Sequence, residues 1–457
     1  MRLFAEKDIL HRSSDFRLER EREDCVFIHR SGAKVATDPV GQAIWEGLPG
    51  TWSEVARHLK LRFAVSDDLV GDYLFLMYRA EVIGIFPSPE PTPAASLLDD
   101  SPCPDLISVV VVTHNGASHI EDCFRSLARQ TYSNREIIAV DNASQDETVA
   151  ILKSRFPQVK LCAQKRNLHY AGGVNVGIKS ARGKYILILN QDTEIADDCL
   201  ARLHQKMKAG DRTGAVVPMM KFFHLRGFIN GIGNQIWPHG WGTDNFIGHI
   251  DIGQFDGLTE VPSACFGAVF LRREVLEDIG LLDEKYGSFY EDVDWSYRCW
   301  LRGWNIVPQP EAIVYHKFGG TYLARPKLML TARNRLRLVL KIFQGKQMLG
   351  TLRRYMTEDI RNFLQFLKQK NFGFAMAYPE AYLSLALGLG NVLRERRRFR
   401  KRKLSGLREL DVLRKNIPFY HCLDPRGFPQ LNVSVLLGCY RWELSKMRKD
   451  GRPEGSD

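Results

Sequence analysis

The chain has 457 residues, 44% of them hydrophobic, which is long enough for two or three domains with buried cores. Its nine cysteines are scattered and never spaced as Cys-x-x-Cys, so neither a disulfide framework nor a zinc site is expected, and a reducing cytosol is predicted. The net charge is +11, but no base-stacking or groove-reading motif accompanies it, and we expect no nucleic-acid partner, no secretion signal and no membrane span.

The amino-terminal part is predicted to be a tail of residues 1–17 followed by a small α+β domain at 18–87. A strand is expected at 25–28 and a closing strand at 82–86. Three helices should begin at Asp38-Pro39, at the capping box Thr51-x-x-Glu54, and at Ser66.

The run from Ser31-Gly32 through Thr37-Asp38-Pro39-Val40-Gly41 to Ile44-Trp45 resembles the PqqD-like domains, which are small winged-helix folds. The resemblance implies recognition of a peptide along a strand edge. A docking or stabilising domain is the alternative. Residues 88–104 are rich in proline and small side chains, which predicts a linker.

Beyond the linker, strands and helices alternate in a pattern that predicts a parallel, doubly wound α/β sheet. The expected strands are 106–113, 135–141, 159–163 and 184–190, with helices near 120–128, 146–155 and 171–181. Ligands bind such sheets outside the carboxyl ends of the strands.

Three polar clusters follow these strand ends and should meet at one crevice: Thr113-His114-Asn115, Asp141 to Ser144, and Asn190 to Thr193. The first turn has a single glycine, Gly116, so the dinucleotide fingerprint is absent and an oxidoreductase is not expected. Asp141 is either a ligand of a base or ribose or a turn cap.

The segment Tyr290-Glu291-Asp292-Val293-Asp294-Trp295 places three carboxylates in the first turn of a predicted helix. One carboxylate suits a metal-bound diphosphate and another suits proton abstraction. The alternative is structural, because Ser288-x-x-Glu291 is a capping-box pattern and acidic residues complement the helix dipole.

These motifs together resemble family 2 inverting glycosyltransferases of the A-type fold, especially the rhamnosyltransferase-like branch. The resemblance covers residues 105–345 and implies a Rossmann-like mixed sheet with helices on both faces. It includes VVTHNGASHIEDCFRSLARQTY, VDNASQDET, NLHYAGGVNVGIKSARGKYILILNQDT, ACFGAVFLRREVLEDIGLLDE, YEDVDWSYRCWLRGW and YHKFGGT.

The resemblance also implies roles for single residues. Asp292 would be the catalytic base, Glu291 an acceptor-binding or positioning residue, and Trp295 a platform for the acceptor sugar. Gly172 and Gly173 would leave room for the donor. The other residues that would contact the donor nucleotide are Thr113, Asn115, Asp141, Asn142, Asn175 and Gln191.

A divalent cation is expected on Asp192, with His316 as a nitrogen ligand, and oxygen ligands favour Mg²⁺ or Mn²⁺. Asn190-Gln191-Asp192 departs from the aspartate-x-aspartate form of many relatives. The cation therefore meets little protein charge, and weak metal affinity without donor is predicted.

The glycine-rich segment 227–257 is predicted to be an irregular acceptor-binding loop, or else an insertion with packed Trp237 and Trp241. Arg333-Asn334-Arg335 opens a basic helix that either approaches an anionic lipid-linked acceptor or membrane, or packs through Leu336, Leu338, Val339 and Leu340.

Residues 346–457 are predicted to be a helical, basic, membrane-associating region. The run 394–403 holds eight basic residues and one acid, and it follows an apolar stretch at 381–393 that is too short to span a bilayer. This stretch is expected to lie in the membrane interface with arginines on anionic headgroups, the alternative being a solvated basic helix.

The predicted function is transfer of a sugar, most simply rhamnose from dTDP-rhamnose, or a sugar from a UDP donor, to a glycan or lipid-linked glycan in surface polysaccharide assembly. The enzyme would be cytoplasmic and peripheral on the inner face of the membrane. The alternatives are a peptide or protein glycosyltransferase that uses the PqqD-like domain, and a non-catalytic nucleotide-sugar-binding scaffold.

Overall fold

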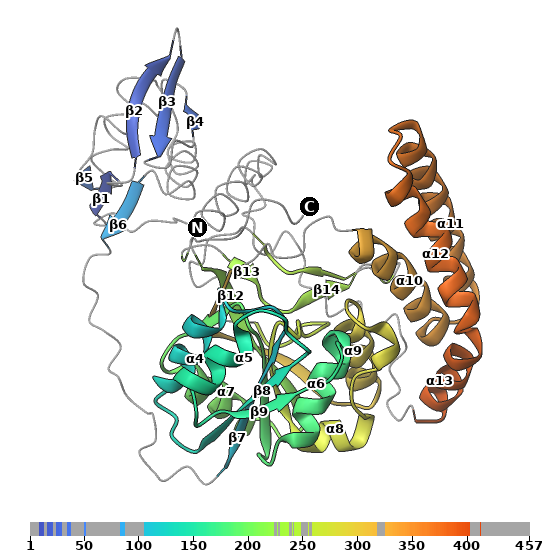
Figure 1. Cartoon of the computed structure of the whole chain (residues 1–457), viewed down its shortest axis with the longest axis horizontal. Coiled ribbons are helices and arrows are strands. Elements are labelled where there is room, and N and C mark those ends of the chain that lie inside the picture. The colour runs from blue at the N-terminus through green and yellow to red at the C-terminus, as the bar shows by residue number, and fades with distance from the viewer. Residues whose placement is uncertain are drawn as a thin grey trace. The chain divides into compact units, whose positions relative to one another are not determined.

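The structure is a computed structural model of a chain that divides into two compact units, one holding the strands before residue 102 and the other holding the described residues from 105 onward. The residues described are 105–223, 226, 229–236, 240, 242–247, 255, 258–317, 325–402 and 412, together with six short strands before residue 87. Figure 1 shows both units.

The amino-terminal unit contains two small antiparallel sheets. One has the order β5 (Gly50–Thr51), β1 (Ile9–Arg12), β6 (Ile83–Phe86), and the other the order β2 (Phe16–Glu21), β3 (Asp24–His29), β4 (Lys34–Thr37). The strands predicted at 25–28 and 82–86 are confirmed as β3 and β6, and β1 lies within the predicted tail. The predicted helices and the linker lie outside the described residues.

The second unit is built on one mixed sheet in the order β11-β17-β12-β16-β10-β7-β8-β9, with β13 added beside β12. Its strands are β7 (Ile107–Thr113), β8 (Arg135–Asp141), β9 (Lys160–Ala163), β10 (Tyr185–Asn190), β11 (Thr193–Ile195), β12 (Thr213–Phe222), β13 (Ile229–Gly231), β16 (Ala268–Arg272) and β17 (Asn305–His316).

Only part of this sheet is parallel. Strands β10, β7, β8 and β9 pair in parallel as predicted, whereas β16 is antiparallel to both β10 and β12. The fully parallel sheet expected from the strand and helix rhythm is therefore wrong beyond β10, and the mixed sheet implied by the family resemblance is confirmed.

Helices cover both faces of the sheet. Helices α4 (Ile120–Ala128), α5 (Thr148–Arg155) and α7 (Cys199–Lys208) pack on one face, against Val109 and Val111 of β7. Helix α6 (His169–Ser180) packs on the other face, against Val110. All seven residues of β7 are buried, because a central parallel strand covered on both faces has no solvent side.

The chain continues through α8 (Arg273–Ile279), the short 3₁₀ helix at Glu284–Tyr286 and α9 (Glu291–Leu301) to a carboxyl-terminal helical array. The array consists of α10 (Arg325–Ile342), α11 (Gly345–Lys368), α12 (Phe372–Leu387) and α13 (Leu389–Arg402). The predicted helical, basic character is confirmed for residues 345–402. Among the described helices, none combines the length and the apolar character needed to cross a membrane.

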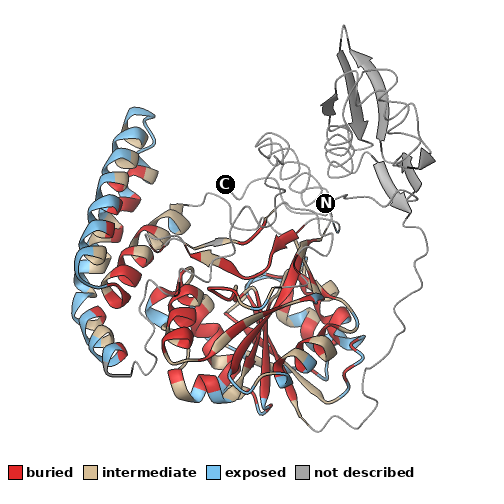
Figure 2. Cartoon of the chain, turned by 180° about the vertical axis from the view of Figure 1, so that it is seen from behind, coloured by how far each residue is buried: buried red, intermediate tan, exposed pale blue. Residues whose placement is uncertain are grey.

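Buried residues concentrate in the sheet and its helices, whereas exposed residues cover much of α11 and α12 (Figure 2). Within the array, Ala332 of α10 packs with Tyr378 and Ala381 of α12. The five described cysteines are free thiols.

Candidate active site

The loops that follow β7 and β8 are joined through the carboxylate of Asp141. Its Oδ1 accepts a hydrogen bond from Thr113 at 3.2 Å, and its Oδ2 accepts one from the backbone N–H of Ser144 at 3.1 Å. Thr113 and Asp141 are both at most 2% exposed. Asp141 therefore organises the crevice at the strand ends, as a turn cap does.

The third strand end reaches the same place through Gln191, which follows β10. Gln191 Oε1 accepts from the backbone N–H of His114 at 2.9 Å, and Gln191 Nε2 donates to the carbonyl of His114 at 3.1 Å. Asn115, at a positive φ of 47°, accepts through Oδ1 from the backbone N–H of Gln145 at 2.8 Å. The predicted convergence of the three polar clusters is confirmed.

The glycines of α6 serve helix packing. A Cβ at Gly173 would stand 2.7 Å from Val112 Cγ1 and 2.9 Å from Asn142 Nδ2, and one at Gly172 would stand 2.8 Å from Leu168 Cβ. The space predicted to accommodate the donor at these glycines is filled by protein atoms. Asn142 is held by donating to the carbonyl of His169 at 2.9 Å, while its buried Oδ1 has no partner in the described structure.

Asn175 is also turned away from the crevice. It is 3% exposed, donates to the carbonyl of Leu282 and to Glu284 Oε1 at 2.9 Å each, and accepts from the N–H of Leu282 at 3.1 Å. These three hydrogen bonds fix the loop before α9. The structure thus gives Asn175 a positioning role in place of the predicted nucleotide contact.

Asp192 and His316 meet at the strand ends, where β11 and β17 pair. His316 Nε2 lies 3.4 Å from Asp192 Oδ2, and His316 Nδ1 lies 2.7 Å from Asn230 Oδ1. Burial alone would raise the pKa of Asp192, but the positive potential and hydrogen bond of His316 lower it to about 2. His316 Nδ1 faces the amide oxygen of Asn230, and this contact orients the ring so that Nε2 is directed at the Asp192 carboxylate.

These two side chains fit a divalent cation for which the protein supplies only two of the ligands. Within the part of the chain that the structure describes, no three His, Cys, Asp or Glu side chains form a metal cluster. A cation here would complete its shell with water and ligand oxygens, as Mg²⁺ and Mn²⁺ do beside phosphates.

Helix α9 starts from an unusual backbone. Phe289 and Tyr290 have positive φ values of 69° and 72°, and Tyr290 is the residue before the first helical turn. The predicted capping box is therefore wrong: Ser288 lies outside the helix, and its Oγ accepts from the backbone N–H of Tyr170 at 3.3 Å. Positive φ at two bulky residues costs free energy, so neighbouring contacts must hold this segment.

Helix α10 supplies those contacts. Asn334, fully buried, donates from Nδ2 to the carbonyls of Tyr286, Ser288 and Phe289 at 2.7–2.9 Å. Arg333 also donates to the Tyr286 carbonyl at 2.7 Å. The Arg333-Asn334-Arg335 motif therefore packs against the protein, with Arg335 paired to Asp359, and its predicted approach to an anionic acceptor is not observed.

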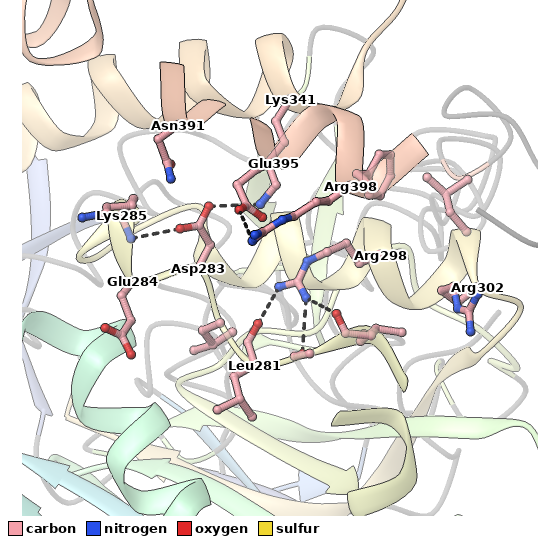
Figure 3. Close-up of a pocket in the computed structure, with 15 residues that line it drawn as sticks. Leu281, Asp283, Glu284, Lys285, Arg298, Arg302, Lys341, Asn391, Glu395 and Arg398 are labelled. Carbon is pink, nitrogen blue, oxygen red and sulfur yellow. Dashed lines mark hydrogen bonds and ion pairs between the residues drawn. The ribbon is translucent and has the colours of Figure 1, made fainter. Parts of the chain in front are cut away.

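The three carboxylates of α9 separate into two environments. Asp294 is fully buried and pairs with Arg298 at 2.9 Å and with Lys341 at 2.8 Å. Lys341 also pairs with Asp283 (Figure 3). This network ties α9 to α10. Asp294 therefore stabilises the helix and leaves Glu291 and Asp292 for chemistry.

Asp292 is held by a hairpin from the glycine-rich segment. Strands β14 (Asn234–Ile236) and β15 (Gly242–Asp244) pair so that Asn234 stands opposite Asp244, which corrects the prediction of an irregular loop for these residues. Asn234 Nδ2 donates to Asp292 Oδ2 at 2.9 Å. Trp237 and Trp241 lie outside the described residues.

The pKa values of the neighbouring acids are driven upward. Burial raises the pKa of Asp292 to about 6, and the charge of Asp244 adds to this rise, while hydrogen bonds from Val293 and Asn234 oppose it. Burial and then Asp292 raise the pKa of Glu291 well above its ordinary value, and Glu291 Oε2 has no partner in the described structure. Asp292 can therefore ionise near neutral pH.

The buried Tyr170 lies within electrostatic reach of both the Glu291–Asp292 pair and Asp192. Its hydroxyl donates to the carbonyl of Phe266, and burial followed by Glu291, Cys265, Asp292 and Asp192 raises its pKa well above the ordinary value. The sequence analysis missed Tyr170, Asn234 and Asp244. Tyr170 lies in the quoted NLHYAGG motif, whereas no local pattern marks Asn234 or Asp244.

Trp295 does not fit the predicted sugar platform. Its side chain is fully buried, and its ring meets that of Phe266 edge to face at 5.4 Å. No ring face is open for a sugar.

A pocket of about 700 Å³ lies beside α9, lined by the segment 279–285 and by α13. Arg298 lines this pocket and donates to carbonyls such as that of Leu281 (Figure 3). Asp192, Asp292 and His316 are not among the lining residues, so this pocket is separate from the candidate active site.

Comparison with known proteins matches part of this chain to one family. Residues 108–280 match the family model for glycosyl transferase family 2. N-acetylglucosaminyl-diphospho-decaprenol L-rhamnosyltransferase from Mycobacterium tuberculosis is 24% identical over 237 residues, covering 46% of this chain and 76% of that protein. Glycosyltransferase GlyG from Streptococcus pneumoniae is 33% identical over 110 residues, 23% of this chain and 36% of that protein.

Among solved structures, mannosyltransferase PcManGT from Pyrobaculum calidifontis in complex with GDP-Man and Mn²⁺ aligns with a TM-score of 0.40 and 16% identity, over 74% of this chain and 86% of that chain. From the matched domain, the relatives and the acidic site at the strand ends, we conclude that residues 108–280 form a glycosyl transferase family 2 domain and that this chain is a glycosyltransferase.

Proposed function

We propose that this glycosyltransferase inverts configuration as it moves rhamnose from dTDP-rhamnose to a glycan or lipid-linked glycan in surface polysaccharide assembly. The named activity of the Mycobacterium tuberculosis relative, an L-rhamnosyltransferase with a diphospho-decaprenol acceptor, supports both the sugar and the lipid-linked acceptor. A UDP-sugar is the alternative donor. The expected location is the cytoplasm, peripheral on the inner face of the membrane.

The observation that carries the proposal is the pair Glu291 and Asp292. Asp292 has a pKa raised to about 6, is held by Asn234 and is partly open to solvent, whereas Glu291 is 5% exposed and has a pKa that burial and the charge of Asp292 raise well above its ordinary value. A general base works best when its pKa lies near the working pH. Asp292 therefore suits the base, and Glu291 suits a neighbour that shapes the acceptor site without competing for the proton.

In the proposed reaction, an Asp292 carboxylate oxygen takes the proton of the acceptor hydroxyl as that oxygen attacks the anomeric carbon. Attack comes from the face opposite the diphosphate. The bond between the anomeric carbon and the diphosphate oxygen breaks, and its electron pair leaves with the nucleotide. One displacement inverts the anomeric centre, so no covalent intermediate on the protein is needed.

Asp192 and His316 are the residues that would hold Mg²⁺ or Mn²⁺. When bound, the cation stabilises the negative charge of the departing diphosphate. Because Asp192 has a pKa of about 2, it stays ionised across the physiological range. A single protein carboxylate supports the expectation that metal binds weakly until the nucleotide supplies further oxygens.

Donor contacts at Thr113, Asn115, Asp141, Asn142 and Gln191 remain part of the proposal, since these residues surround the crevice at the strand ends. Glycosylation of a peptide remains the alternative function, but the residues that predict the PqqD-like domain lie largely outside the described part of the chain.

The test is Asp292→Asn, compared with Glu274→Gln, which changes an exposed acid in the first turn of α8. We expect Asp292→Asn to lower turnover at least about 100-fold, while Glu274→Gln has no effect. Donor binding, read as a rise in melting temperature with nucleotide and Mn²⁺, should survive in both variants. Normal turnover in Asp292→Asn would remove Asp292 as the base.

A further inference from the structure

The large apolar side chains that reach solvent gather in one region. Ten large hydrophobic residues are exposed in the described structure, and all of them lie between residues 349 and 393. They are Leu349, Met356, Ile360 and Leu364 of α11, Phe372, Met376, Leu383 and Leu387 of α12, and Leu389 and Leu393 of α13. The described part of residues 105–342, which includes the sheet and the active site, exposes none.

On α11 the exposed apolar residues follow the helical repeat. Residues 349, 356, 360 and 364 are separated by seven, four and four positions, so they form one stripe along the helix. Buried Tyr355 and Asp359 occupy a different side, where both residues contact Arg335 of α10. The stripe therefore lies away from the packed face of α11.

Helix α12 is apolar on both sides. Ala375, Ala377, Tyr378 and Ala381 are buried, whereas Phe372, Met376, Leu383 and Leu387 are 47–83% exposed. Its only charged residue is Glu380. A helix that is hydrophobic all round needs apolar surroundings on every side. Helices α10 and α11 both pack against α12, and the remaining surface of α12 is open to solvent (Figure 2).

The same region carries most of the net positive charge of the chain. Residues 345–402 hold 13 lysines and arginines against four acidic residues, in a chain whose net charge is +11. Lys346, Arg354, Arg361 and Lys368 are exposed on α11 and, by helical spacing, lie along one flank of its apolar stripe. A stripe of leucine, isoleucine and methionine bordered by cations is the pattern of helices that lie in a membrane interface.

Charge also decides between possible occupants of this surface. A second copy of the chain would bring together two segments 345–402, each with 13 basic residues against four acids, which like-charge repulsion opposes. Residues 403–457 are themselves net basic, with ten lysines and arginines against seven acids. An anionic lipid surface is complementary both to the cations and to the apolar stripes.

The predicted membrane contact was the stretch 381–393 with the arginines after it. In the structure, Ala381 and Val392 of that stretch are fully buried, whereas its leucines 383, 387, 389 and 393 are exposed. Arg396 donates to the carbonyls of Leu340 and Phe343 in and just after α10. Helix α13 is thus partly engaged with the domain.

We propose that the α11–α12 hairpin is the membrane-docking surface of this enzyme, which inserts Leu349, Met356, Ile360 and Leu364 of α11 and Phe372, Met376, Leu383 and Leu387 of α12 among anionic lipids without crossing the bilayer. The proposal rests on the peripheral location proposed above and is independent of the donor sugar. Docking would hold the enzyme at the surface where a lipid-linked acceptor resides.

The test is co-sedimentation of the full chain with vesicles of phosphatidylglycerol and phosphatidylcholine, and with phosphatidylcholine alone. The wild type should bind the anionic vesicles more strongly, and salt should weaken this binding. The quadruple variant Met356→Gln, Ile360→Gln, Leu383→Gln, Leu387→Gln should lower the vesicle partition coefficient at least about tenfold. The control Thr357→Gln with Gln365→Ala, polar changes on the same hairpin, should bind normally.

A nucleotide-induced rise in melting temperature and the solution mass of each variant complete the experiment. Loss of vesicle binding with the nucleotide response retained supports docking whether or not rhamnose is the donor. Full vesicle binding by the quadruple variant would overturn the proposal. The proposal would also be overturned if the wild type does not bind vesicles but forms a dimer that the quadruple variant cannot form. The apolar stripes would then bind a second copy of the chain.

Discussion

Removing the side-chain amide of Asn234 should move the acid limb of the pH–rate profile to higher pH. Asn234 Nδ2 donates to Asp292 Oδ2 at 2.9 Å, and this bond stabilises the ionised carboxylate. Asn234→Ala removes the donor and leaves Asp292 in its buried setting. Because a protonated base cannot accept the acceptor's proton, kcat/KM falls as pH drops below the pKa of Asp292.

The size of the shift follows from the energy of the bond. A hydrogen bond to a charged group contributes about 1.5–3 kcal/mol, and one pKa unit corresponds to about 1.4 kcal/mol. Asn234→Ala should therefore raise the pKa of Asp292 from about 6 by about 1–2 units. At pH 6, where half of the wild-type Asp292 is ionised, the rate should fall about 5- to 50-fold, whereas at pH 9 it should approach that of the wild type.

Asp244→Asn is the matched variant of opposite sign. Asp244 faces Asn234 across the hairpin, and its charge raises the pKa of Asp292, so its removal should move the acid limb to lower pH. The assay is kcat/KM from pH 5 to 9 at saturating Mn²⁺. An unmoved limb in both variants, or a uniform loss of rate at every pH in Asn234→Ala, would refute the electrostatic reasoning.

Three further predictions concern stability. The pKa of Asp292 in the folded chain lies above its ordinary 3.8, so the folded state binds a proton at Asp292 more tightly than the unfolded state does. The folded chain therefore loses stability as pH rises from about 4 to 6. Asp292→Asn should add about 1–3 kcal/mol to the free energy of unfolding at pH 8 and less at pH 5. A Cβ at Gly177 would stand 2.1 Å from Val110 Cγ1, so Gly177→Ala should lower the free energy of unfolding by about 1–3 kcal/mol. A Cβ at Gly350 would have nothing within 4 Å, so Gly350→Ala should raise the free energy of unfolding by about 0.5–1 kcal/mol. Urea unfolding measures both changes. Asn334→Ala should lower the melting temperature and kcat while sparing donor binding, because the carbonyls of Ser288 and Phe289 lose the Asn334 donor, whereas that of Tyr286 keeps its bond from Arg333.

The parallel half of the sheet could be predicted because its information is local. The strand Ile107–Thr113 is a run of β-branched residues, which marks a strand buried on both faces, and the three polar clusters follow strand ends directly. The antiparallel placement of β16 between β10 and β12 depends instead on which edges remain open after the first four strands pair. No local pattern encodes that choice.

The active site divides in the same way. Asp292, the proposed base, and Asp192, the proposed metal ligand, each lie in a motif at an element boundary, so the sequence alone could single them out as candidates. Asn175 and Trp295 belong to the same motifs, yet Asn175 bonds the loop at Leu282 and Trp295 packs on Phe266. A motif indicates that a residue is constrained, but the partner that constrains it comes from another part of the chain.

The position of the base depends on segments far from it in sequence. The hairpin residue Asn234 holds the carboxylate of Asp292, and Asn334 of α10 holds the positive-φ backbone before α9. Since α10 also carries the α11–α12 hairpin through Ala332 and its neighbours, a force on the hairpin would act on the helix that anchors the base. Helix α10 therefore links the surface proposed for docking to the residue proposed for catalysis.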